Sequence, residues 1–333
     1  MIKSFVRKAL PVVLAIGLLT YALKDISFRA ISEQFKQANY GLISLVGLVT
    51  VCSYFLRGKR WQQPLLALGY RPTAFRTTIA MQTGIISSMI VLGSGELTRC
   101  ATLQRTDGIP LSQGIGSVVA ERIVDLFMLA LVMLLTLLLE FSRMRNYLAG
   151  LDLAAPNAYL VLGVISLFGL IGLIAWRTLR SPLVRQHPFA IRIFNLLLGF
   201  GKGFMSIRQL PQPGLFMLLT FLNQLLSWLI TYLLLLAVES TQHLPPSAAL
   251  TILTVSSLGG LAVPTQGGIG TYHFLVSRAL VLYGFSSAEG AVVATFLHAV
   301  GFGINLLLSS LSFLLLPLLI TTKATKHPDS LVE

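Results

Sequence analysis

The sequence has 333 residues, of which 55% are apolar and only 11% are charged. Because soluble domains carry about 25% charged residues, this composition excludes a water-soluble fold. The 25 Lys and Arg outnumber the 12 Asp and Glu and give a net charge of +13. Since the bases lie in loops beside apolar runs, they indicate membrane topology and anionic lipid, and we expect no nucleic-acid partner.

Six apolar runs are long enough to be membrane spans. They cover residues 9–23, 40–56, 114–141, 158–176, 214–238 and 290–320, each near or above the roughly 17–25 residues that cross a bilayer. The first run resembles the core of a signal peptide, but no small-x-small cleavage site follows it, so we expect a retained helix. The sequence predicts an all-α polytopic membrane protein with six full spans.

Two weaker segments, 77–93 and 247–263, are diluted by Gly, Ser and Thr, and each ends in a Gly-rich turn. A backbone that breaks at membrane depth is tolerated only where protein or water satisfies its polar groups. We therefore predict two re-entrant, broken helical elements, with 273–285 as the return limb of the second. The total is about eight membrane segments.

The distribution of bases predicts the orientation. Loop 57–76 has five bases and no acid, and the connection 177–213 has six bases and no acid. Since short cytoplasmic loops hold the excess of Lys and Arg, we expect both termini on the cytoplasmic side of the plasma (inner) membrane. The first broken element then enters from the cytoplasm and the second from outside. Loop 57–76 either reflects topology alone or also recruits anionic lipid.

An internal repeat is indicated when residues 108–124 are aligned with 284–300, which superposes Gly108 on Gly284 and Gly114 on Gly290. The predicted halves, about 40–141 and 214–320, lie within a single membrane domain over 1–333 and have opposite topology. Inverted repeats with a broken segment in each half are typical of secondary transporters. The alternative is that the glycines only let helices pack closely.

Three charged residues, Glu121, Arg122 and Asp125, fall inside the predicted span 114–141. Each costs at least about 2.5–3.5 kcal/mol at the bilayer centre, so each needs a partner or water. Arg122 and Asp125 are three residues apart and can pair, whereas Glu121 points about 100° away and needs another partner. Arg122 is suited to hold a lipid phosphate; a fixed ion pair or interfacial snorkelling is the alternative.

The first turn contains Gly95, Glu96 and Arg99 within the string GELTR. Its glycine lets backbone amides approach an anionic headgroup, with Arg99 as a second contact, although Glu96 and Arg99 are also spaced to pair. We assign Gly95, Arg99 and Arg122 to headgroup binding. Glu96, together with Glu121 and Asp125, is assigned to gating or coupling.

The second turn contains a helix-breaking proline and three glycines, Pro264, Gly267, Gly268 and Gly270. We expect the glycines to bind the headgroup as well. His273 and His298 are the histidines we place at membrane depth, either as helix-contact groups or in gating or coupling to a proton gradient.

Motifs for other chemistry are missing. The sequence has no GxSxG, HExxH or P-loop string, and its two cysteines, Cys52 and Cys100, form neither a disulfide framework nor a Cys-x-x-Cys site. We expect no enzyme activity, no cofactor and no metal.

Three blocks give the chain a family resemblance: GELTR at 95–99, SVVAERIVDLF at 117–127 and PTQGGIGTYHFLVSRALVLYG at 264–284. Over nearly the whole length, the chain resembles the transmembrane, flippase-like region of lysylphosphatidylglycerol synthase. This resemblance implies two inverted repeats with re-entrant helices that move amphipathic or polyprenyl-type lipids between leaflets.

The chain also departs from that family. The family's first block has a proline before its Gly-Glu, where Val91, Leu92 and Gly93 stand here, and its second block commonly has an acid at the position of His273. No aminoacyl-transferase domain follows the last apolar run, so we expect no aminoacylation of phosphatidylglycerol.

The leading hypothesis is a standalone flippase-like transporter of a phospho- or polyprenyl-type lipid. One alternative is an integral-membrane transferase acting on a lipid-linked substrate, with Glu121 or His298 as base. Another is a noncatalytic scaffold for an envelope-lipid enzyme. The expected partner is an anionic or isoprenoid-linked membrane lipid, with an envelope-lipid synthase as a second candidate; the pattern specifies neither the lipid nor the oligomeric state.

Overall fold

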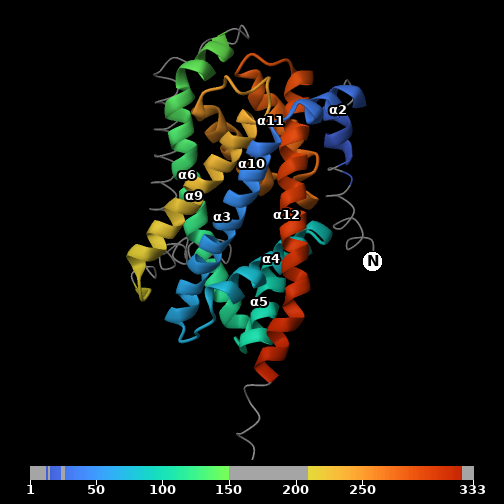
Figure 1. The fold of residues 1–333 in the computed structure, drawn as a ribbon. Helices are drawn as coiled ribbons and strands as arrows, with labels where there is room; N and C mark the ends of the chain where they lie inside the picture. The colour runs from blue at the N-terminus through green and yellow to red at the C-terminus, as the bar shows by residue number, and fades with distance from the viewer. Residues whose placement is uncertain (1–12, 14–15, 24–26, 150–208, 325–333) are drawn as a thin grey trace, which may run out of the picture. The chain divides into compact units, whose positions relative to one another are not determined.

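The structure is a computed structural model that describes residues 13, 16–23, 27–149 and 209–324 (Figure 1). The regular elements in these ranges are helices. The first set is α2 (Phe28–Gln37), α3 (Tyr40–Ala67), α4 (Ala74–Ile90), α5 (Gly95–Asp107) and α6 (Leu111–Ala149). The second set is α9 (Pro213–Leu236), α10 (Pro246–Ala262), the short 3₁₀ helix η3 (Gln266–Gly268), α11 (Thr271–Val281) and α12 (Ser287–Ala324).

Local sequence explains several helix ends. The Asn39 side chain accepts a hydrogen bond from the Leu42 amide at the start of α3, and Thr73 caps α4 in the same way. Gly108 ends α5 with a φ of 72°, a left-handed conformation that glycine adopts without a steric penalty. These caps satisfy backbone groups that a helix leaves unpaired at its ends.

Four helices within the described ranges are long and apolar enough to cross a membrane: Tyr40–Ala67, Leu111–Tyr147, Pro213–Leu236 and Ser287–Pro317. They correspond to four of the six predicted spans. The predicted span 158–176 lies outside the described residues, and 9–23 lies only partly inside them. Most of the predicted connection 177–213 is also outside.

The two weak segments are broken as predicted. Helix α4 stops at Ile90 and α5 begins at Gly95, while α10 stops at Ala262, before Pro264, and α11 begins at Thr271. Each break joins two short helices that pack on each other, α4 on α5 and α10 on α11. Both pairs contact α12, along which Figure 1 shows them at different heights.

The tips of the two helix pairs meet. The Gln266 Nε2 donates a hydrogen bond to the Ile90 carbonyl oxygen at 3.3 Å, and η3 packs on α4. Two segments that are 176 residues apart in the chain therefore come together where each backbone is broken.

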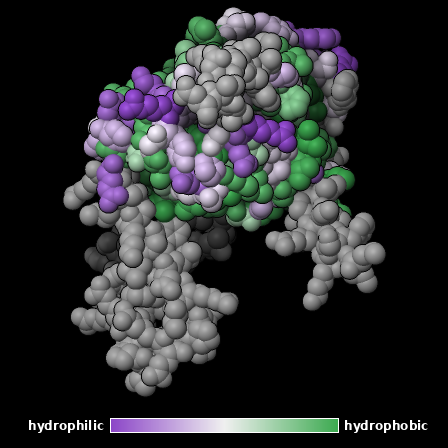
Figure 2. Space-filling model, turned by 90° about the horizontal axis from the view of Figure 1, so that it is seen from below, coloured by the Kyte–Doolittle hydropathy of each residue, from purple (hydrophilic) through white to green (hydrophobic). Residues whose placement is uncertain are grey.

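The chain divides into two compact units, one formed by Met1–Thr136 with Leu210–Glu333 and the other by Leu137–Gln209. The tips and the charged residues discussed below belong to the first unit. On its surface, large apolar side chains remain exposed, as expected where helices face lipid. Examples are Leu131, Leu134, Leu135, Leu218, Phe221, Leu225, Leu307, Leu311 and Leu314. Figure 2 shows hydrophobic residues beside hydrophilic ones on the face seen from below.

The predicted extent of the loop over 57–76 is wrong, whereas its cytoplasmic side stays a prediction. Helix α3 continues to Ala67, and α4 begins at Ala74, so only residues 68–73 connect them. The apolar run ends at Leu56, but the helix continues because several of the following residues pack inside the protein. Arg60 is 2% exposed and Trp61 is fully buried.

Candidate functional site

The site begins on the second half of α3, where close packing buries charged side chains. Gly58 allows α4 to approach, since a Cβ atom there would clash with Thr78. The Thr77 hydroxyl also donates to the Gly58 carbonyl oxygen at 2.8 Å. Just after this contact along α3, Arg60 bonds to Glu121 of α6 and Trp61 to Ser117 of α6.

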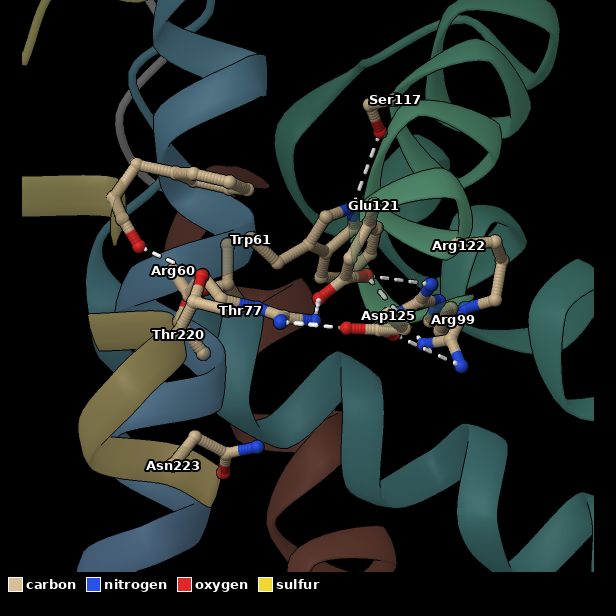
Figure 3. A network of polar contacts seen from close by, with 12 residues as sticks. Arg60, Trp61, Thr77, Arg99, Ser117, Glu121, Arg122, Asp125, Thr220 and Asn223 are labelled. Carbon is tan, nitrogen blue, oxygen red and sulfur yellow. Dashed lines mark hydrogen bonds and ion pairs between the residues drawn. The ribbon is translucent and has the colours of Figure 1, made fainter. Parts of the chain in front are cut away.

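Glu121 of α6 lies at the centre of the site and is 1% exposed. Its Oε1 accepts from Arg60 Nη2 at 2.6 Å, and its Oε2 accepts from Arg99 Nη2 at 2.9 Å (Figure 3). Each carboxylate oxygen therefore has its own guanidinium, which is the pairing that a buried charge requires. The expectation that Glu121 needs another partner is confirmed by Arg60 and Arg99, although Arg122 Nη2 also lies 3.7 Å from Glu121 Oε2.

The other charges extend this network toward a more open side. Arg60 Nη1 also donates to Asp125 Oδ1 at 2.6 Å, so one guanidinium bridges two carboxylates of α6. Arg122 Nη1 lies 3.3 Å from Asp125 Oδ2, as the spacing predicts, and its Nε lies 3.5 Å from Glu96 Oε1. With 42% of its side chain exposed, Arg122 is the outermost of these cations.

Arg99 has two further partners. Its Nε lies 2.6 Å from Glu96 Oε2, so the pairing predicted from their spacing is present. Its guanidinium carbon also sits 4.5 Å from the centre of the Trp61 ring, and Trp61 Nε1 donates to Ser117 Oγ at 3.0 Å. Arg99 is therefore poorly placed for its predicted role as a headgroup contact, because its side chain is 4% exposed and already paired with carboxylates.

Among the four arginines of the site, Arg57 has no charge partner in the described part of the chain. No hydrogen bond or ion pair joins it to another described residue, and its Nε is buried without a hydrogen-bond partner. The site holds four guanidinium groups, on Arg57, Arg60, Arg99 and Arg122, and three carboxylates, on Glu96, Glu121 and Asp125. One positive charge is therefore left uncompensated.

Two cavities meet at this charge. The first has a volume of about 600 Å³ and lies among α3, α6, α9 and α10. The second has a volume of about 360 Å³ and lies among α3, α4, α5, α6 and the η3 region. Arg57 and Arg122 line both cavities. Predicted site residues Gly95, Glu96, Arg99, Gly267 and Gly268 line the second cavity.

The glycines of the second turn have conformations that need glycine. Gly267, Gly268 and Gly270 have φ angles of 60°, 77° and 83°. Gly270 does not line either of the two cavities. Its amide instead donates to His273 Nδ1 at 3.4 Å. Pro264 lies between the end of α10 and η3, as expected of a helix breaker.

The two predicted histidines lie together beside this turn. The ring centres of His273 and His298 are 4.7 Å apart, and His298 Nε2 is 2.8 Å from the Gly267 carbonyl oxygen. A third cavity of about 280 Å³ is lined by His298 and by Gly267, which also lines the second cavity. The two histidines therefore contact the second glycine-rich turn, and not the cluster of arginines and carboxylates.

Sequence reasoning missed Arg57 and Arg60 as site residues because both were assigned to a loop. A usable signal was present: Glu121 lacked a partner, and Arg57 and Arg60 are three residues apart just after an apolar run. Among the described residues, no group of three or more His, Cys, Asp and Glu is placed to hold a metal ion.

Comparisons with known proteins give one result. The family model described as the lysylphosphatidylglycerol synthase TM region matches residues 8–309. No curated protein and no solved structure matches the chain. Together with the four helices able to cross a bilayer, the family match indicates a multi-pass membrane protein with a lipid-related function. The chain belongs to the family of the lysylphosphatidylglycerol synthase TM region.

Proposed function

We propose that this protein moves a lipid with a phosphate-containing headgroup between the leaflets of the inner membrane, and that it is not an enzyme. The observation that carries the proposal is Arg57, an unpaired guanidinium that lines two cavities together with the half-exposed Arg122. A guanidinium pair is well suited to a phosphate, because its planar donors bind two oxygens at once.

The two buried arginines of the network, Arg60 and Arg99, support the assignment of Arg57 and Arg122 to the phosphate site. Arg60 and Arg99 are held by Glu121 and by their other carboxylates, so they form a frame rather than a ligand site. Arg57 and Arg122 then supply the contacts that remain for an anion. Because Glu121 is buried between two guanidinium groups, it is poorly suited to act as the general base of a transferase.

We further propose that the two sets of helices are inverted repeats, with the termini on the cytoplasmic side and six full spans. The starts of α5 and α11 (271 − 95) and of α6 and α12 (287 − 111) are both 176 residues apart. Gly108 and Gly284 have the same offset, and both have positive φ, 72° and 90°. Shared helix starts and shared turn glycines favour a repeat.

Packing glycines support the same alignment. A Cβ atom on Gly114 would lie 3.2 Å from Cys100 Cβ of α5, and a Cβ atom on Gly290 would lie 2.7 Å from the Ser277 carbonyl oxygen of α11. In both sets, the long last helix thus approaches the preceding short helix at the aligned glycine. In transporters built this way, the substrate site lies between the repeats near the bilayer midplane. By this analogy, we propose that the contact between the two tips marks the same level in this chain.

The proposal is tested by leaflet exchange in liposomes that contain the purified protein. Fluorescent phospholipids are quenched from outside, and the rate at which the inner-leaflet signal is lost is measured. The Arg57→Gln variant should slow the exchange roughly 10- to 100-fold, because a charge-assisted contact contributes about 1.5–3 kcal/mol. Lys59→Gln removes an exposed base from the same helix and serves as the matched control.

An exchange rate equal to that of protein-free liposomes, for anionic, aminoacylated and isoprenoid lipids alike, would refute the proposal. An active Arg57→Gln variant with an unchanged rate would remove Arg57 from the site. Turnover of a labelled lipid by the purified protein would favour the transferase instead.

A further inference from the structure

The first cavity has a wall of uncharged polar side chains on α9. Thr220, Asn223, Gln224 and Ser227 line it, and their spacing of three, four and seven residues places them on one face of the helix. Polar side chains inside an otherwise apolar span are costly unless they find hydrogen-bond partners. The four residues therefore form a polar stripe that faces the cavity. Figure 3 shows Thr220 and Asn223 on α9 near Arg60.

The stripe has free donors and acceptors. Asn223 Oδ1 accepts from Ser53 Oγ at 3.1 Å, which leaves its Nδ2 available to donate. The Gln224 amide has no hydrogen bond to another described residue. The hydroxyls of Thr220 and Ser227 donate to carbonyl oxygens of their own helix at 2.8 and 2.9 Å, which leaves their lone pairs open to accept. Such a mixture suits hydroxyl groups, which donate and accept together.

The charge of the cavity disfavours a cationic ligand. Its lining includes Arg57, Arg60 and Arg122 but one carboxylate, that of Asp125. That carboxylate is already bound by Arg60 Nη1 at 2.6 Å and lies 3.3 Å from Arg122 Nη1. An ammonium group would have to compete with two guanidinium groups for this carboxylate, and the surplus of guanidinium groups repels it.

The first cavity also has an apolar wall that suits the acyl or prenyl chains of a lipid. The remaining wall of the cavity includes five apolar residues, Leu126, Met128, Leu129, Leu253 and Leu261. A volume of about 600 Å³ falls within the range of about 300–1,000 Å³ that is usual for ligand pockets. The cavity thus offers a phosphate contact, a hydroxyl-binding stripe and an apolar wall to one molecule.

We propose that the first cavity selects a lipid whose phosphate carries an uncharged, polyhydroxylated group, either a polyol or a sugar. The phosphate lies against Arg57 and Arg122, and the hydroxyls bind the α9 stripe. This inference rests on the proposed function and adds the substrate class to it. It also predicts that the cavity discriminates against aminoacylated and ethanolamine lipids, because their headgroups carry an ammonium group.

The test is a competition of lipids for the full chain in detergent, measured by native mass spectrometry. The probes are phosphatidylglycerol, a glycosyl-phosphoprenol, phosphatidylethanolamine and phosphatidic acid. We expect the first two to bind at least several-fold more than the last two. The stronger of the first two tells whether the hydroxyls come from a polyol or a sugar.

Variants of the α9 stripe test whether this wall of the cavity causes the preference for hydroxylated headgroups. Gln224→Met keeps the length of the side chain and removes its hydrogen bonds, and Ser227→Ala is a smaller second change. Each should lower the preference over phosphatidic acid about fivefold, the effect of one hydrogen bond. Thr231→Val is the control, since Thr231 is on the same helix, does not line the cavity and donates to the Ser227 carbonyl oxygen at 3.0 Å.

Equal binding of all four lipids, or a preference that survives both variants, would overturn the inference. If Arg57→Gln then still weakens every phosphate lipid alike, the proposed phosphate site stands without a selective stripe. If none of the four lipids binds, the proposed function falls together with the inference.

Discussion

Replacing Glu121 by Gln is expected to be among the most destabilising single changes in the first unit. Glu121 is 1% exposed, and both of its oxygens accept from guanidinium groups, Arg60 at 2.6 Å and Arg99 at 2.9 Å. The neutral amide removes one negative charge and leaves four cations facing two carboxylates. Breaking a buried ion pair on one side costs about 3–5 kcal/mol, because the remaining charge is uncompensated.

The free energy of unfolding in mixed detergent micelles measures this effect, with the loss of helical circular dichroism on titration with a denaturing detergent as the signal. A loss of about 3–5 kcal/mol lowers the folding equilibrium constant by roughly 10²- to 10⁴-fold. Glu239→Gln removes an exposed carboxylate and should change the free energy by less than about 0.5 kcal/mol.

A double-mutant cycle with Arg60→Met isolates the pair. Because the two side chains are in direct contact, the double variant should be less destabilised than the sum of the single variants. If Glu121→Gln is as stable as the control variant, or if the two changes simply add, the network does not hold the helices together and the reasoning is wrong.

Two further predictions concern packing. Gly290→Ala should destabilise the protein by about 1–3 kcal/mol, because the added Cβ would lie 2.7 Å from a backbone oxygen of α11. Gly301→Ala is the control and should be near neutral, since no atom lies within 4 Å of the added Cβ. The measurement is thermal unfolding, and equal melting temperatures of the two variants would contradict the prediction. The hydroxyls of Thr136 and Thr254 lie 2.8 Å apart. In a double-mutant cycle of Val variants, their coupling energy should be only about 0.6 kcal/mol, the average for hydrogen bonds between membrane helices. A coupling energy above about 2 kcal/mol would contradict this prediction.

Hydropathy and turn residues predicted much of the fold. The four apolar runs that lie in described residues are membrane-length helices, and the glycine-rich turns break the weak segments where expected. These features depend on local composition, which one sequence records directly. Pro264 and Gly108, for example, end helices for reasons that are local to the chain.

The candidate site was less accessible to prediction because it depends on distant contacts. Arg60 looks like a loop residue, since its neighbours are polar, yet Glu121, 61 residues later, holds it inside the protein. A hydropathy scale assigns the same cost to a charge in lipid and a charge beside its partner. His273 and His298 were likewise predicted at membrane depth, but nothing in their spacing predicted that their rings would be neighbours.

In the described part of the chain, one hydrogen bond joins the tips of the two helix pairs, and this has a mechanical consequence. The bond from Gln266 to the Ile90 carbonyl contributes only about 0.5–1.5 kcal/mol, and it uses a long side chain rather than backbone on one partner. Close to it, Gly267 packs so tightly on the Phe302 ring that a Cβ atom would lie 2.6 Å from it. Because Phe302 belongs to α12, this tight contact holds the second tip against α12 and not against the first tip. Breaking the polar link between the tips therefore leaves the packing of the second tip on α12 intact.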